Sequence, residues 1–206
     1  MFKPEHSGSL YHNYKRFFSI VLLAVCDTDY CFTFIDVGSY GKSGELQIYK
    51  NSELYKRMKD NNLNLPEPRP LTDPGEPLTF CFIGDEAFAL EENVQRPYSG
   101  KNLTEKRKIY NYRLLRVRRY IQRTFGILSN KWRIFHRPLN VNEDFCADII
   151  KACCVLRNFV RKTDGFKLDE TLETIGLHNV QSSTPVRSHY AASVQDKLDD
   201  YFISKI

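Results

Sequence analysis

The chain has 206 residues, and its composition of 42% hydrophobic, 13% aromatic and 27% charged residues is typical of one globular domain rather than of a disordered protein. Its formal net charge is +5. No run approaches the roughly 18 consecutive apolar residues of a membrane-spanning helix, and the N-terminus lacks the apolar core of a signal peptide. We therefore expect no membrane contact and no secretion.

Six cysteines are present, none of them in a C-x-x-C pair, and four lie inside apolar runs. We interpret them as core thiols in a reducing compartment, with a zinc or disulfide site as the alternative.

The N-terminal half predicts a hairpin. After a polar lead-in over residues 1–15, Phe17–Cys26 and Tyr30–Val37 have the length and β-branched content of strands. The short turn between them predicts an antiparallel pair with Asp27 at its tip. A glycine-rich loop follows without phosphate-loop spacing, and then Ile48–Met58 is predicted as a helix capped by Asn51 or Ser52.

A third predicted strand, like the first, is followed by an acid. Asn61–Pro77 holds five prolines and is expected to be a connecting loop. Leu78–Ile83 is continuously apolar, which predicts a central strand buried on both faces. Gly84-Asp85-Glu86 ends that strand.

The next segment is strongly basic. Arg107–Leu128 is predicted as one long helix, opened by Leu103-Thr104-Glu105 and closed at Gly126. Eleven Lys and Arg fall between Lys106 and Arg137 without any Asp or Glu. Such a charge density indicates either a polyanion such as nucleic acid or pairing with Asp148, Asp164 or the acidic residues of the C-terminal tail. The residues of this helix predicted to contact DNA are Lys108, Arg113, Arg116, Arg118, Arg119 and Arg123.

The C-terminal part begins with an apolar helix, Cys146–Val160, in which hydrophobic residues recur at three- and four-residue steps. We expect residues 163–206 to form a polar tail with a short helix at Val194–Phe202. The main domain is then residues 16–162.

The two strand-end acids suggest metal chemistry. Divalent-metal phosphodiester cleavage needs carboxylates from different elements to hold Mg²⁺ or Mn²⁺. Asp27 and Asp85 fit that role, with Asp29, Asp36 and Glu86 as nearby competitors. The alternative is that an acid after a strand is only a turn or cap residue.

A resemblance to a known family supports the first interpretation. From about Ser7 to Phe159 the chain closely resembles the DDE domain of Harbinger-type transposases and their domesticated nuclease relatives. The sequence segments that carry this resemblance are SGSLYHNYKRFFSIVLLAVCDTDYCFTFIDVGSYG, KNSELY, FIGDEAFAL, RPYSG, IYNYRL, FGIL and WRIF.

The resemblance implies an α/β, RNase H-like fold with a mixed sheet flanked by helices in a single domain. It implies catalytic, metal-binding roles for Asp27 and Asp85. The family's third acid, a Glu, falls at Gln122 in this chain. The family also has an Asp where Glu45 stands and favours Leu-His-Asn where this chain has Leu156-Arg157-Asn158. It normally carries an upstream helical DNA-binding region, which we expect to be missing here.

Gln122 changes the expected mechanism. An amide offers a metal only a neutral oxygen, so Mg²⁺ or Mn²⁺ is expected to bind weakly and cleavage to be impaired. The sequence therefore predicts an incomplete metal-dependent DNA endonuclease, located in the nucleus or cytoplasm. The alternative is a catalytically silent domesticated domain that binds DNA or a DNA-binding partner protein, and a third is a truncated element copy.

Overall fold

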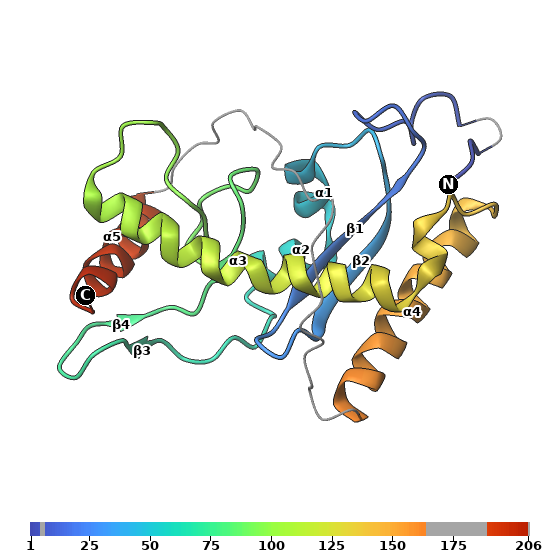
Figure 1. The fold of residues 1–206 in the computed structure, drawn as a ribbon. Coiled ribbons are helices and arrows are strands. Elements are labelled where there is room, and N and C mark those ends of the chain that lie inside the picture. Colours follow the sequence, from blue (N-terminus) through green and yellow to red (C-terminus); the bar gives the residue numbers. More distant parts are fainter. Residues whose placement is uncertain (5–6, 164–188, 206) are drawn as a thin grey trace. The chain divides into compact units, whose positions relative to one another are not determined.

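The computed structural model describes residues 1–4, 7–163 and 189–205, which form helices and small two-stranded sheets (Figure 1). This mixture agrees with the predicted α/β class. The described residues form two compact units: a first unit of Met1–Lys56 with the chain from Tyr120 to Thr163, and a second unit of Arg57–Arg119 with the C-terminal helix. None of the described helices is long and apolar enough to cross a membrane.

The predicted hairpin is confirmed in the first unit. Strands β1 (Ile20–Cys26) and β2 (Phe32–Tyr40) pair antiparallel, with Leu23 opposite Asp36. β1 begins later than predicted because Phe17 belongs to a turn: its N–H donates to the Asn13 side chain, 3.2 Å away. Asp27 follows β1 directly, as the sequence predicted.

The predicted helix Ile48–Met58 is instead two short helices. They are α1 (Glu45–Asn51) and α2 (Glu53–Lys59), separated by Ser52 in an extended conformation with ψ 153°. The buried Ser52 hydroxyl accepts a hydrogen bond from the Tyr55 N–H, so Ser52 caps α2 as the sequence suggested. The single-helix prediction was wrong because this cap takes Ser52 out of helical geometry.

Two long helices follow, α3 (Glu105–Lys131) and α4 (Glu143–Thr163). The prediction that Gly126 closes α3 was wrong, since the helix continues through it to Lys131. A glycine inside a helix costs only about 1 kcal/mol relative to alanine. Phe125 and Leu128, on either side, pack into the core of the first unit, and that burial outweighs the cost.

The core of the first unit joins the hairpin to these helices. Phe32 of β2, Leu128 of α3 and Cys153 and Cys154 of α4 are buried together. All six cysteines are free thiols, so the disulfide alternative is excluded. Burial raises the pKa of the Cys154 thiol to about 11, which keeps it protonated and unreactive.

In the second unit, the predicted central strand Leu78–Ile83 is not formed. Its ends lie in different sheets: β4 (Pro77–Leu78) pairs antiparallel with β3 (Arg69–Pro70), and β5 (Phe82–Ile83) pairs parallel with β6 (Val94–Gln95). Prolines in β3 and β4 remove N–H donors, which limits that ladder to two residues.

Helix α5 (His189–Ile203) completes the second unit and includes the span where the sequence predicts a helix. Its Leu198 and Phe202 pack on a buried cluster of Tyr98, Tyr110 and Leu114. The Tyr110 hydroxyl donates to the Gln95 side chain over 3.1 Å, which ties α3 to β6. The part of the predicted tail over residues 164–188 lies outside the described residues.

Candidate functional site

Asp27 organises the tip of the β1–β2 hairpin. Its Oδ1 accepts hydrogen bonds from the N–H groups of Asp29 (2.9 Å) and Cys31 (2.8 Å). The Asp27 N–H and the Cys31 carbonyl close the loop over 2.9 Å, and Tyr30 takes a positive φ of 60°. One carboxylate oxygen thus has a structural role, which is the turn-residue alternative, and Asp27 is half-buried.

Helix α4 fixes this tip in place. The Asn158 side chain makes two hydrogen bonds to the backbone of Phe32: it accepts from the N–H (2.9 Å) and donates to the carbonyl (2.7 Å). Arg161 donates from Nε to the Asp29 carbonyl over 3.0 Å, and its guanidinium lies over the Tyr30 ring. The segment that carries Asp27 is therefore held rigidly by side chains of α4.

A third α4 residue near the hairpin tip, Arg157, is unusual. Arg157 is only 2% exposed, and its Nε and Nη2 have no hydrogen-bond partner within the described parts of the chain. Burial lowers the pKa of its guanidinium. Its charge lies over the Phe32 ring, 5.6 Å from the ring centre, which compensates little of the lost hydration. The segment Leu156-Arg157-Asn158, where the family favours Leu-His-Asn, is the one sequence feature that pointed to these α4 contacts.

Asp85 lies in the second unit, one residue beyond the glycine that follows β5. Its Oδ1 accepts the Ala87 N–H over 2.9 Å, and its Oδ2 lies 3.4 Å from Nη2 of Arg118. A Cβ at Gly84 would lie 2.9 Å from the Phe88 ring, so any other residue at this turn would have to displace that ring. The side chains of Asp85 and Arg118 are 26% and 12% exposed, so this ion pair is partly shielded from water.

The pairing of Arg118 with Asp85 is a contact that sequence reasoning missed, because Arg118 was assigned to DNA with the other basic residues. A carboxylate that already faces a guanidinium is less available to a cation. This arrangement reduces the attraction of Asp85 for a metal ion.

Gln122 is half-buried on α3 in the first unit, next to Ile121 of that unit's core. Among the described residues, no group of three or more His, Cys, Asp and Glu side chains is placed to hold a metal ion. Asp29, Asp36 and Glu86, the alternative metal-binding acids named from the sequence, also belong to no such group among the described residues. Gln122 carries an amide, so the three positions named from the sequence offer two carboxylates rather than three.

The basic residues of α3 divide by face. Arg116, Arg119 and Arg123 recur at three- and four-residue steps, which places them on one exposed face of the helix. Exposed Tyr112 and Lys108 continue this face at four-residue steps toward the N-terminal end of α3. We call Arg116, Arg119 and Arg123 the arginine stripe. Within the described ranges no carboxylate forms an ion pair with any of the three, and Arg123 donates to the Tyr30 hydroxyl over 3.3 Å.

The other basic residues of this helix differ. Lys108 pairs with Glu105 over 2.6 Å at the exposed start of α3, and Arg113 is half-buried.

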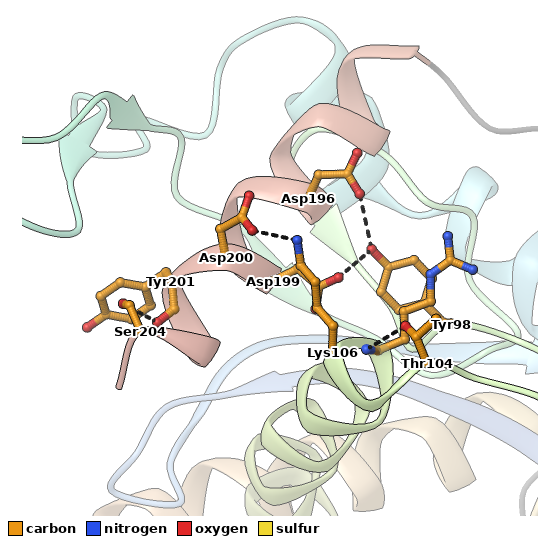
Figure 2. Close-up of polar contacts among 9 residues, drawn as sticks. Tyr98, Thr104, Lys106, Asp196, Asp199, Asp200, Tyr201 and Ser204 are labelled. Atoms are coloured by element: carbon orange, nitrogen blue, oxygen red, sulfur yellow. Dashed lines mark hydrogen bonds and ion pairs between the residues drawn. The ribbon is translucent and has the colours of Figure 1, made fainter. Parts of the chain in front are cut away.

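Acids of α5 compensate the N-terminal end of α3, as the tail alternative anticipated (Figure 2). Asp200 pairs with Lys106 at 2.5 Å. The Tyr98 hydroxyl donates to Asp196 and Asp199, over 3.3 and 3.2 Å. Asp199 is buried, and burial raises the pKa of its carboxyl. An α5 acid thus pairs with the charge of Lys106, whereas the arginine stripe has no acidic partner among the described residues.

Comparison with known proteins now adds to this geometry. Residues 2–158 match the model of a family described as DDE superfamily endonuclease, and the chain belongs to that family. It is also similar to Protein ALP1-like of Arabidopsis thaliana, at 25% identity over 204 residues, which cover 98% of this chain and 50% of that protein. The chain therefore spans about half the length of this relative. No solved structure matches it.

The prediction of a DDE-type, transposase-related domain is confirmed at the level of the family. The predicted roles of single residues stay predictions.

Proposed function

We propose that this chain is a Harbinger-related DDE endonuclease domain, RNase H-like in origin, in which DNA cleavage is impaired and DNA binding is retained. The observation that carries the proposal is Gln122, an amide where the family resemblance expects the third carboxylate. It lies on α3, where no acid follows Glu105. Asp27 and Asp85 remain as the catalytic and metal-binding carboxylates. They bind Mg²⁺ or Mn²⁺ weakly, because hard cations depend on charged oxygen ligands.

Two local contacts support impaired cleavage. Asp27 uses Oδ1 to hold the hairpin tip, and Asp85 faces the guanidinium of Arg118. Each contact occupies carboxylate oxygen atoms that a metal ion would need. Loss of one electrostatic stabiliser typically costs on the order of 10²–10³ in rate, so residual cleavage is expected to be very slow.

DNA binding rests on the arginine stripe. Three exposed guanidinium groups on one helix face neutralise phosphates without reading sequence. If each contacts one phosphate, the logarithm of the binding constant falls with the logarithm of salt concentration with a slope of about −2.7 from these residues alone. A DNA-binding role implies a nuclear location.

Cleavage is tested with supercoiled plasmid and Mn²⁺. Wild-type protein is expected to nick negligibly, and Gln122→Glu is expected to raise nicking by at least about tenfold, because it restores a carboxylate. Gln47→Glu is the matched control, since it makes the same change on an exposed helix position and should have no effect. Efficient nicking by wild type, lost in Asp85→Asn, would overturn the proposal of impaired cleavage.

DNA binding is tested separately, by fluorescence anisotropy across a salt series. Replacing Arg116, Arg119 and Arg123 together with Gln should flatten the salt slope by about 2.7. A control variant with Lys42, Lys50 and Lys56 replaced by Gln removes the same charge from exposed sites elsewhere. An equal loss of DNA affinity and salt slope in both variants would show that DNA binding depends only on the net charge of the chain. No binding by wild type would favour the partner-protein alternative.

A further inference from the structure

A tight loop precedes β1 in the first unit (Figure 1). Its shape is fixed by Asn13, whose N–H donates to the Phe17 carbonyl and whose carbonyl accepts from the Arg16 N–H, both over 3.0 Å. The side-chain oxygen of Asn13 accepts from the N–H groups of Lys15 (3.0 Å) and Phe17 (3.2 Å). We call residues 13–17 the aromatic–basic loop.

The base of this loop is anchored as well. His12 and Phe18 form an antiparallel bridge, and their rings meet edge-on with centroids 5.3 Å apart. The Ser19 N–H donates to the carbonyl of Tyr11 over 2.8 Å, and Tyr11 is buried. The loop therefore presents its outer side chains from a fixed base.

The tip of the loop combines aromatic rings with positive charge. Four consecutive side chains are exposed there: Tyr14, Lys15, Arg16 and Phe17. The two aromatic residues are 69% and 52% exposed, and Nζ of Lys15 lies 5.7 Å from the centre of the Tyr14 ring. No carboxylate of the described residues forms an ion pair with either cation, and the sequence has no acid from position 7 to position 26.

The backbone of Arg16 is a further sign that this tip has a function. Its φ of 66° lies in the left-handed region, which glycine adopts readily and a long side chain does not. Strained residues of this kind cluster at functional sites. Because glycine would suit the turn better, we attribute the arginine at this position to its charge.

We infer that the aromatic–basic loop binds single-stranded nucleic acid. The two rings stack on unpaired bases, and the two cations neutralise neighbouring phosphates, which is the combination that single-strand-binding proteins use. An acidic protein surface would use the charges but not the exposed rings. The loop contains no residue of the arginine stripe, so this inference goes beyond the proposed function and does not rest on it.

The rings are tested by fluorescence anisotropy of the full chain with a labelled twelve-nucleotide dT strand and a duplex of the same length. Tyr14→Ser and Phe17→Ser should each weaken binding of the dT strand at least about fivefold, the lower end of the loss of one base–aromatic stack. Both variants should bind the duplex as wild type does, because paired bases are not free to stack on the loop. Tyr14→Phe keeps the ring and should bind the dT strand like wild type.

Arg16→Gly separates the charge from the turn. Glycine relieves the positive φ, so the thermal unfolding temperature should stay equal or rise. Affinity for the dT strand should fall, and its salt slope should flatten by about 0.7, the value for one phosphate contact on a single strand. Arg16→Lys keeps the charge and should bind like wild type. Lys56→Gln, the matched control, removes one charge from an exposed position of α2 and should leave the slope unchanged.

DNA and RNA strands share the chemistry that the loop recognises. Neither stacking nor phosphate contact reads the 2′-hydroxyl, so a twelve-nucleotide rU strand should bind as the dT strand does. A preference for either strand of more than about tenfold would overturn the assignment of stacking and phosphate contact.

Three other results would overturn the inference. They are a wild-type chain that binds no dT strand up to about 100 μM, ring substitutions that weaken duplex and single strand equally, and Arg16→Gly binding like wild type. The first would leave a protein as the occupant of the loop. The proposed function fails separately: a chain that binds the dT strand through this loop but binds no duplex would refute the arginine stripe and leave the present inference standing.

Discussion

The pair of hydrogen bonds between Asn158 and the backbone of Phe32 predicts a large loss of stability on substitution. In Asn158→Ala, the Phe32 N–H and carbonyl both lose their partner, at a residue that is only 8% exposed. An unsatisfied buried polar group costs about 1–3 kcal/mol, so the two together should lower the free energy of unfolding by about 2–6 kcal/mol. That is a considerable fraction of the 5–15 kcal/mol typical of a domain.

The chain provides a convenient reporter for this prediction. Trp132 is the sole tryptophan, it packs against the core of the first unit, and its indole N–H donates to the Cys153 carbonyl over 3.1 Å. Urea unfolding followed by tryptophan fluorescence therefore reports on the unit that contains Asn158. Hydrogen exchange provides a second readout, because the Phe32 amide should lose its protection.

Asn142→Ala is the matched control, since it removes an asparagine that immediately precedes the same helix. The Asn142 side chain accepts one hydrogen bond from the Phe145 N–H at the exposed start of α4, so its loss should cost only about 1 kcal/mol. If the two alanine variants unfold at the same urea concentration, Asn158 does not hold the hairpin tip as argued, and the rigidity assigned to the Asp27 loop falls with it.

Two further predictions concern buried charges. Arg157→Met should raise the free energy of unfolding by about 1–3 kcal/mol in the same assay, because it removes a buried guanidinium with two nitrogens that have no partner among the described residues. Arg161→Met, the control, loses the bond to the Asp29 carbonyl and should lower the free energy of unfolding. A destabilised Arg157→Met variant would show that the charge of Arg157 is compensated. Burial raises the pKa of Asp199 above its ordinary value of 3.8, so the folded state favours the protonated acid and stability falls as pH rises through the window above 3.8. Asp199→Asn should remove that fall, measured as thermal unfolding of the second unit between pH 4 and 7, while exposed Asp200→Asn should keep it; an unchanged pH dependence in Asp199→Asn would refute the assignment.

Local features of this chain follow from the sequence by itself. The β-branched runs on either side of a short turn determine the antiparallel hairpin and place Asp27 at its tip. The acid-free run of arginines determines the basic face of α3, since three- and four-residue spacing alone puts Arg116, Arg119 and Arg123 together. The sequence segments shared with Harbinger-type transposases are enough to identify the endonuclease family. The sequence also shows that Gln122, an amide, stands where the resemblance expects an acid.

Contacts between distant residues were decided only by the tertiary structure. Arg118 and Asp85 are 33 positions apart, and Asn158 and Phe32 are 126 apart, so no periodicity or spacing links them. The run Leu78–Ile83 has the composition of a buried strand, but its ends pair with different segments, because strand formation depends on which partner lies alongside. The charge of Asp85 is visible in the sequence, whereas the guanidinium that faces it depends on how α3 packs in the folded second unit.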